Sequence, residues 1–174
     1  SKLFIDEAYL SFVDEPWDSI SLLDYPNVVL VRSMSKDYSY SALRLGFALA
    51  SKEVVSKLRA LQPDWSVNSL AQKSGISALE DNEYLPKVRK VVFSAKKYLK
   101  TALKELGLDI VDSDANFLMI RVDNASRCRT ILLKKGFVVR DCTSFGLPNY
   151  IRVGIRVIDD CKVLVKAISE VVQV

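Results

Sequence analysis

The stretch that decides the fold of this 174-residue chain reads Asn27-Val28-Val29-Leu30-Val31-Arg32-Ser33-Met34-Ser35-Lys36. Its first part is rich in β-branched apolar residues and follows Tyr25-Pro26, so it predicts a buried strand that ends at the serines. A lone lysine after a strand is most often a solvated loop residue, since lysines are mostly exposed. The residues that surround Lys36 favour a chemical role instead.

Lys36 has hydroxyl groups and an arginine close to it in the sequence. Ser33 and Ser35 precede the lysine, and Arg44 follows it by eight residues, with Gly46 two positions further on. A lysine amine can form a Schiff base with an aldehyde, and a guanidinium fork with neighbouring hydroxyls binds phosphate well. The spacing therefore predicts a site for a cofactor that carries both an aldehyde and a phosphate.

A carboxylate and a phenol lie upstream in Asp6-Glu7-Ala8-Tyr9. Asp6 ends a predicted strand at residues 2–6, where it could be a simple strand-end cap, and Tyr9 could be ordinary packing. With the lysine stretch, however, Asp6 can pair with a pyridinium nitrogen and Tyr9 with a ring oxygen. Together these residues predict a pyridoxal 5'-phosphate site, at the carboxyl ends of strands in an open α/β sheet.

A second candidate site contains arginines in the last third of the chain. Arg152 lies in a predicted strand at residues 150–156, where it is either a solvent-facing edge residue or a buried anion receptor. Arg140 and Arg156 raise the same question. We predict that the three converge near Phe145-Gly146 and bind a substrate with more than one anionic charge.

The composition excludes several classes of function. Hydrophobic residues make up 49% and charged residues 26% of the chain, which is typical of a folded globular protein. The net charge of +4 comes from scattered residues and not from a basic block, so nucleic acid is not an expected partner. The chain has no histidine, which removes histidine bases, histidine metal ligands and Ser-His nucleophiles. No metal site is predicted.

The cysteines and the distribution of apolar residues indicate the cellular compartment in which the protein is expected. Cys128, Cys142 and Cys161 have neither CxxC nor zinc-site spacing, so we expect reduced thiols in a cytoplasmic protein. The first residues enter a strand directly, without a signal-peptide pattern. No apolar run approaches the roughly 20 residues that span a bilayer, so no membrane partner is expected.

The pattern of elements predicts two domains. Further strands are expected at residues 45–50, 108–111, 116–122 and 137–140, and helices at 51–61, 68–79, 83–106, 125–135 and 159–172. The helix at 83–106 is long and amphipathic and connects the two parts. We therefore predict an α/β chain in which residues 1–85 are part of a large cofactor-binding domain. Residues 86–174 form a small α+β carboxyl-terminal domain.

These residues together resemble the fold-type I pyridoxal-phosphate enzymes, specifically the histidinol-phosphate aminotransferase family and its close relative threonine-phosphate decarboxylase. The resemblance covers essentially the whole chain, in the family's order and spacing. The segments that carry it are Asp6-Glu7-Ala8-Tyr9, Ser33-Met34-Ser35-Lys36, Leu43-Arg44-Leu45-Gly46, Asn68-Ser69-Leu70-Ala71, Ala115-Asn116-Phe117, Arg140-Asp141-Cys142-Thr143-Ser144-Phe145 and Ile151-Arg152-Val153.

The resemblance implies a role for each candidate residue. Lys36 is the Schiff-base lysine, and Arg152 receives the anionic group of the substrate. The remaining implied roles are ring contacts for Asp6 and Tyr9, phosphate contacts for Ser33, Ser35 and Arg44, and further substrate contacts for Arg140 and Arg156.

The resemblance also implies a reaction and its partners. It implies transfer of an amino group between a phosphorylated amine and 2-oxoglutarate, in histidine biosynthesis, by a homodimer. The alternatives are a threonine-phosphate decarboxylase and a catalytically incomplete fragment of such an enzyme. The chain resembles only the carboxyl half of the fold, because the family's glycine-rich loop, ring-stacking aromatic residue and ring-oxygen asparagine belong to the amino half.

Overall fold

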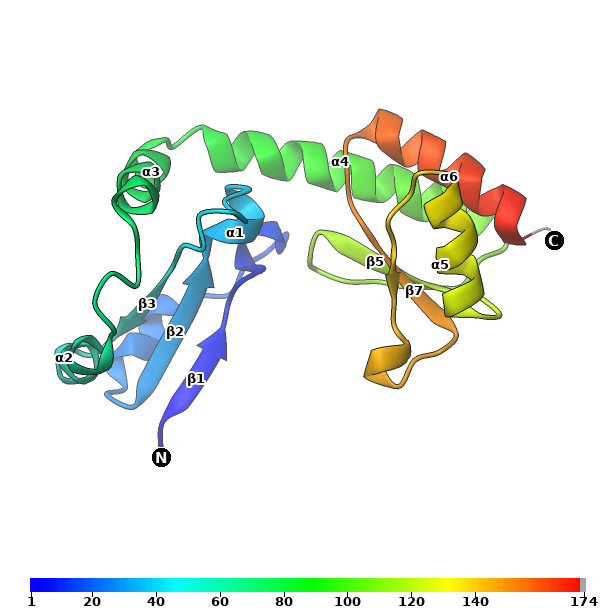
Figure 1. Cartoon of the computed structure of the whole chain (residues 1–174). Coiled ribbons are helices and arrows are strands. Elements are labelled where there is room, and N and C mark those ends of the chain that lie inside the picture. Colours follow the sequence, from blue (N-terminus) through cyan, green and yellow to red (C-terminus); the bar gives the residue numbers. More distant parts are fainter. Residues whose placement is uncertain (173–174) are drawn as a thin grey trace. The chain divides into compact units, whose positions relative to one another are not determined.

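The computed structural model describes residues 1–172. It divides into two compact units, Ser1–Val88 and the part that begins at Arg89. Each unit has its own sheet (Figure 1). The strand order is β1-β2-β3 in the first and β4-β5-β7-β6 in the second. Helices accompany both sheets, which confirms the predicted mixed α/β class.

The first unit is built on three short strands. They are β1 (Leu3–Asp6), β2 (Val28–Ser33) and β3 (Gly46–Ala50), each within a residue or so of its predicted position. β1 is parallel to β2, with Asp6 opposite Val31, and β3 is antiparallel to β2. The carboxyl ends of β1 and β2 therefore lie at one edge of the sheet, and this edge carries Asp6 and Ser33.

The faces of this sheet are incompletely covered. The first half of β2 is buried, with Leu30 fully inaccessible. By contrast, Phe4 is 62% exposed and Leu3 is 50% exposed. A parallel strand pair normally has both faces covered, so the sheet leaves apolar surface open to further packing.

Short and regular helices complete the first unit. Between β1 and β2 the chain forms two 3-10 helices, η1 (Leu10–Phe12) and η2 (Ile20–Asp24). The turn α1 (Met34–Asp37) follows β2, and α2 (Lys52–Leu61) and α3 (Ser69–Glu80) follow β3. Asn68 caps α3, because its side chain accepts a hydrogen bond from the Ala71 amide at 2.8 Å.

The second unit packs helices on one face of an antiparallel sheet. The helix α4 (Tyr84–Glu105) starts in the first unit and continues into the second. The other elements are β4 (Ile110–Val111), β5 (Phe117–Arg121), α5 (Ala125–Lys134), β6 (Arg140–Asp141), the 3-10 helix η3 (Thr143–Phe145), β7 (Tyr150–Gly154) and α6 (Ile158–Val172).

The core of the second unit follows from strand alternation. Leu118 and Ile120 of β5 and Ile151 of β7 are fully inaccessible and pack in one cluster with residues of the helices. Successive side chains of a strand point to opposite faces, so Arg152 lies on the face away from this core.

One strand of the second unit is displaced from its predicted position. The strand expected at residues 137–140 is observed as β6 (Arg140–Asp141). The Phe137 amide instead donates to the Leu132 carbonyl oxygen at 2.9 Å, and Gly136 adopts a φ of 87°. These are the bonds of a Schellman helix end, so Phe137 completes the end of α5 and cannot start a strand.

No helix within residues 1–172 is long and apolar enough to span a membrane. The same residues contain no group of three or more Cys, Asp or Glu side chains that could hold a metal ion.

Candidate cofactor and substrate site

Lys36 lies on the turn α1, directly after β2. Ser33 caps the turn, since its hydroxyl accepts a hydrogen bond from the Ser35 amide at 3.2 Å. The Met34 side chain is buried, whereas Lys36 is exposed. The Lys36 ammonium group lies over the Tyr9 ring, 5.9 Å from the ring centroid. The structure thus brings Lys36 and Tyr9 together from segments 27 positions apart in the sequence.

Asp6 occupies the last position of β1 and is exposed at the same edge of the sheet. One carboxylate oxygen accepts a hydrogen bond from the Ala8 amide at 2.9 Å. This bond holds the Asp6 side chain close to the start of the turn that leads to Tyr9. Among residues 1–172, no donor bonds to the second carboxylate oxygen.

Arg44 is placed by the loop that returns from α1 to β3. The Met34 amide donates to the Leu45 carbonyl oxygen at 3.1 Å, and Ser33 pairs with Gly46 across the sheet. Arg44 has a φ of 54°, an uncommon left-handed conformation for a residue with a side chain, and its guanidinium donates to the Ser41 carbonyl oxygen at 2.9 Å. The loop therefore places Ser33, Ser35 and Arg44 in one short segment of the structure.

Gly46 allows the close approach of β3 to β2 at this point. A Cβ atom at position 46 would lie 2.7 Å from the Arg32 carbonyl oxygen, which is backbone and cannot rotate away. We expect Gly46→Ala to destabilise the first unit by about 1–3 kcal/mol, the usual cost of overpacking. Native-state hydrogen exchange of the β2 amides measures this change. The control is Gly154→Ala in β7 of the second unit, where an added Cβ has nothing within 4 Å, and its effect is measured at the β7 amides. Equal losses of opening free energy in the two units would contradict the prediction.

A buried ion pair, which was not predicted from the sequence, joins the residues next to Asp6 and Ser33. The Glu7 side chain is only 2% exposed, and its Oε2 accepts a hydrogen bond from Arg32 Nε at 2.9 Å. Arg32 also donates to the Ser19 hydroxyl at 3.3 Å. Within residues 1–172, Glu7 Oε1 has no hydrogen-bond partner. Side chains alternate between the two faces of a strand, so an outward Asp6 places Glu7 inward. This alternation could have predicted that Glu7 is buried.

The second unit brings together two of the three predicted arginines. Arg152 is directly opposite Arg140 on one side and Met119 on the other, so the two guanidinium groups share a sheet face. Arg152 lies 4.8 Å from the Phe117 ring centroid. Arg140 lies 5.1 Å from the Phe145 ring centroid and donates to the Ser144 hydroxyl at 2.8 Å.

The charge of this arginine pair is not neutralised within the described chain. Neither Arg140 nor Arg152 forms an ion pair with any carboxylate of residues 1–172. Like charges on directly opposed strand positions repel each other. An anion that bound between them would relieve this repulsion.

Arg156 is engaged differently. It follows the end of β7, and its Nε lies 3.1 Å from an Asp160 carboxylate oxygen in an exposed ion pair. It therefore has a local partner at the start of α6, in contrast to Arg140 and Arg152.

Asp141, next to Arg140, is a strongly hydrogen-bonded carboxylate. It accepts bonds from the Ser126 hydroxyl and from both the amide and the hydroxyl of Thr143, and these bonds lower its pKa to about 2. Because the pKa is lower in the folded chain than in the unfolded one, the stabilisation is present above about pH 4 and is lost toward pH 2.

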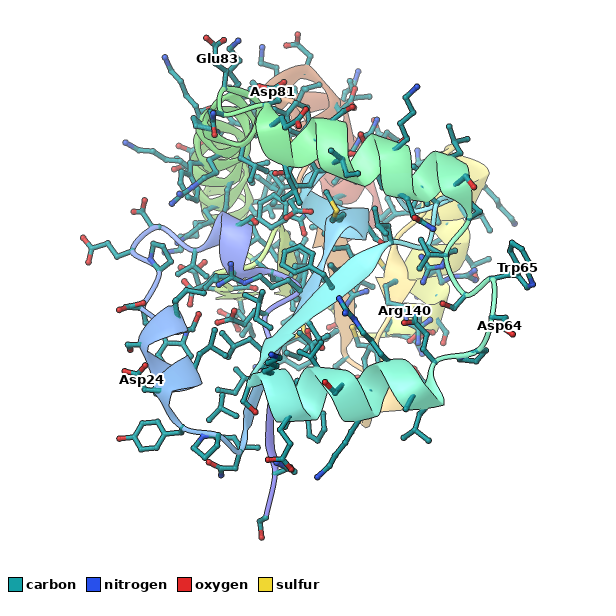
Figure 2. All side chains as sticks on the ribbon, turned by 90° about the vertical axis from the view of Figure 1, so that its left-hand side faces the viewer. Asp24, Asp64, Trp65, Asp81, Glu83 and Arg140 are labelled. Atoms are coloured by element: carbon teal, nitrogen blue, oxygen red, sulfur yellow. The ribbon has the colours of Figure 1, made fainter. Side chains whose placement is uncertain are left out.

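We therefore expect Asp141→Asn to lower the thermal unfolding midpoint at pH 6 and to have a much smaller effect at pH 2, where the carboxyl is largely protonated in the unfolded chain and about half protonated in the folded one. Circular dichroism melting at several pH values measures the difference between the variant and the parent chain. Asp64→Asn, at an exposed loop position visible in Figure 2, controls for the loss of one negative charge. A difference of equal size at pH 6 and pH 2 would show that the carboxylate charge is not the cause.

The three cysteines are free and buried, and burial raises the pKa of each thiol. A raised pKa leaves little reactive thiolate at neutral pH. Cys142, the one nearest the arginine pair, therefore acts as a small packing residue and offers no nucleophile.

Comparison with known proteins places the chain in a family. The family model "Aminotransferase class I and II" matches residues 2–168. The chain is 39% identical over 167 residues to a histidinol-phosphate aminotransferase of Symbiobacterium thermophilum. The aligned region covers 95% of this chain and 46% of that protein. It thus spans about half the length of the curated relatives it matches.

Solved structures show the same fold. A histidinol-phosphate aminotransferase of Sinorhizobium meliloti, in complex with pyridoxal-5'-phosphate, matches with a TM-score of 0.88 at 24% identity, over 99% of this chain and 49% of that one. An L-threonine-O-3-phosphate decarboxylase of Porphyromonas gingivalis matches with a TM-score of 0.86 at 22% identity, over 100% of this chain and 56% of that one. Since the family model covers nearly the whole sequence and the fold agrees, the chain belongs to the aminotransferase class I and II family and corresponds to about half of a typical member.

Proposed function

We propose that this chain is the carboxyl half of a pyridoxal-phosphate-dependent aminotransferase that acts on a phosphorylated amine, as histidinol-phosphate aminotransferase does. The observation that carries the proposal is the position of Lys36 over the Tyr9 ring, at the edge of the sheet where β1 and β2 end. An exposed lysine held by a packed turn is available to an aldehyde, and a phenol beneath its amine can hydrogen-bond to the cofactor ring.

The residues present fit the cofactor in their donor set. Ser33, Ser35 and Arg44 would hold the phosphate, for which the guanidinium and the hydroxyls are suited donors. Asp6, with one carboxylate oxygen still available, would hold the proton on the pyridine nitrogen, and Tyr9 would bond to the ring oxygen. When bound, the cofactor supplies an electron sink for the bond that breaks at the substrate carbon.

The part of the chain in the reaction is proton transfer and orientation. In the proposed reaction Lys36 Nζ, when it is not attached to the cofactor, takes the proton from the substrate Cα as general base. The same amine later returns the proton as general acid. Asp6 keeps its counter-charge beside the ring throughout, so the residues of the first unit would provide attachment, proton transfer and charge balance.

We propose the arginine pair of the second unit as the substrate receptor. Histidinol phosphate carries a phosphate and 2-oxoglutarate carries two carboxylates, so both substrates of a transaminase would match two unneutralised guanidinium groups. Arg152 and Arg140 would provide this receptor. Arg156 is a further candidate contact that would first have to release Asp160.

A decarboxylase on the same scaffold is the second candidate. The fold match to L-threonine-O-3-phosphate decarboxylase supports it, and a substrate with a phosphate and a carboxylate would also suit the arginine pair. A third possibility is that the chain alone binds the cofactor without turnover, because it spans only about half of its relatives. In each case we propose that an amino-terminal half and a second copy of the chain complete the site.

The experiment that tests the proposal is an absorbance titration with pyridoxal 5'-phosphate, followed by product analysis. The chain is assayed alone and with the amino half of the Symbiobacterium thermophilum relative. Glutamate-dependent transfer with the histidinol phosphate couple would support the aminotransferase, and release of CO2 from threonine phosphate would support the decarboxylase. A cofactor band without turnover would identify a cofactor-binding half, and no band in either preparation would overturn the proposal.

A further inference from the structure

The turn that carries Lys36 is too short to fix its own orientation. It contains only the four residues of α1, Met34–Asp37. Helices shorter than about 12 residues are marginal in isolation, because nucleation fixes several residues for a single hydrogen bond. The Ser33 cap adds one bond, and hydrogen bonds to Leu45 and Ser11 tie the turn to neighbouring segments. The rotation of the turn, and with it the direction of Lys36, also depends on packing of the turn against its surroundings.

That packing involves two residues spaced by one helical turn. Met34 and Tyr38 are four positions apart, so their side chains lie on the same face of the turn. Met34 is 2% exposed and Tyr38 is 9% exposed, and both belong to one hydrophobic cluster. Lys36 lies midway between them, so burial of this face directs Lys36 to the opposite, exposed face.

Tyr38 is held by an aromatic stack from a distant part of the sequence. Its ring lies 5.5 Å from that of Tyr84, with an angle of 12° between the planes, whereas the Tyr40 ring is tilted by 37° at 6.1 Å. Stacked rings add a preferred geometry to the burial of apolar area. The Tyr38 ring is therefore held in both position and orientation.

Tyr84 is itself well anchored, because it is the first residue of α4. The Asp81 carboxylate accepts hydrogen bonds from the Tyr84 amide at 3.0 Å and the Glu83 amide at 2.9 Å. Figure 2 shows Asp81 and Glu83 at the junction between α3 and α4. The start of α4 thus provides a fixed surface for the Tyr38 ring.

We propose that Tyr38 is a positioning residue for Lys36: by stacking on Tyr84 it sets the rotation of the α1 turn and so holds the Lys36 amine over the Tyr9 ring. The inference rests on the proposed function and deepens it. It assigns the position of the Lys36 amine to the stack of Tyr38 on Tyr84, which lies outside the candidate site. It also ties that position to the first turn of α4, the helix that continues into the second unit.

The test follows the Lys36 amine directly, without a cofactor. Lysines of the intact chain are labelled by reductive methylation with 13C-formaldehyde, and the Lys36 signal is assigned by its absence in Lys36→Arg. Because the amine lies over an aromatic ring, we expect a ring-current displacement of this signal that disappears in Tyr9→Leu. Tyr38→Leu and Tyr84→Leu are both expected to abolish the displacement, and Tyr38→Phe, which keeps the stacked ring, is expected to retain it.

The matched control is Tyr40→Leu, the same substitution in the same hydrophobic cluster. The Tyr40 ring is not stacked on Tyr84, and its hydroxyl donates to the Ser74 carbonyl oxygen at 3.4 Å. It should retain the displacement. A displaced Lys36 signal in folded Tyr38→Leu or Tyr84→Leu would overturn the proposal, as would loss of the displacement in Tyr40→Leu.

Amide spectra report whether each variant folds. If Tyr38→Leu does not fold, Tyr84→Leu tests the positioning role in its place. Since no cofactor is added, these spectra are independent of cofactor binding. A failure of the positioning role is therefore distinguishable from a failure of the proposed function.

Discussion

Lys36→Ala is expected to abolish covalent attachment of pyridoxal 5'-phosphate to this chain. The reason is chemical, since attachment requires a primary amine at the end of a side chain that reaches the cofactor aldehyde. Lys36 is the lysine placed beside Tyr9, after the strand that ends at Ser33. Borohydride reduction followed by peptide mapping would measure the attached cofactor. In the parent chain the adduct should be found on the peptide that contains Lys36. In the variant it should be found on no peptide.

In the proposed enzyme, completed by an amino-terminal half, the same substitution should also slow product formation. A positioned general acid–base group contributes typically about 10²–10⁴-fold to the rate, and the loss should be at least of this order. The matched control is Lys57→Ala, which removes another exposed lysine, one paired with Glu53 at 2.5 Å on α2. An adduct that survived in Lys36→Ala, or that was lost in Lys57→Ala, would contradict the assignment of Lys36.

Glu7→Leu is expected to destabilise the first unit by about 3 kcal/mol. Removal of one partner from a buried ion pair leaves the other charge uncompensated, which typically costs about 3–5 kcal/mol. The lower end of the range applies, because the remaining Arg32 side chain is 27% exposed and retains some hydration. Since Glu7 follows Asp6 and Arg32 precedes Ser33, the loss should also loosen the edge of the sheet that carries the candidate cofactor contacts.

Native-state hydrogen exchange of the β2 amides would measure this loss as a smaller free energy of opening. Glu53→Leu is the control, since its pair with Lys57 is exposed on both sides, and exposed pairs contribute about 0–1 kcal/mol. The double variant Glu7→Leu, Arg32→Leu should recover much of the stability, because no buried charge remains. Equal effects of Glu7→Leu and Glu53→Leu would show that burial of the pair is not important.

Several features of the first unit could be predicted from local sequence. The β-branched run before Ser33 indicated a buried strand, and the strand was found as β2 within one residue of the prediction. The lysine stretch, the serines and Arg44 lie close in the sequence, so one loop is sufficient to bring them together. The long amphipathic segment predicted at residues 83–106 is α4, shortened by one residue at each end.

The substrate-site prediction depended on more distant contacts. That Arg140 and Arg152 share a sheet face follows from the antiparallel register of β6 and β7, which the sequence does not state. The shift of β6 from its predicted position has a similar origin, since the Schellman end of α5 uses Phe137.

The sequence by itself determined where most strands and helices form and which segment carries the candidate lysine, because apolar periodicity, caps and glycines act over a few neighbouring residues. Only the tertiary structure decided that Glu7 pairs with Arg32 and that Tyr38 stacks on Tyr84. These partners are separated by 25 and 46 positions, and no local pattern encodes them. They depend on strand register and on which faces become buried, and those are set only when the whole unit packs together.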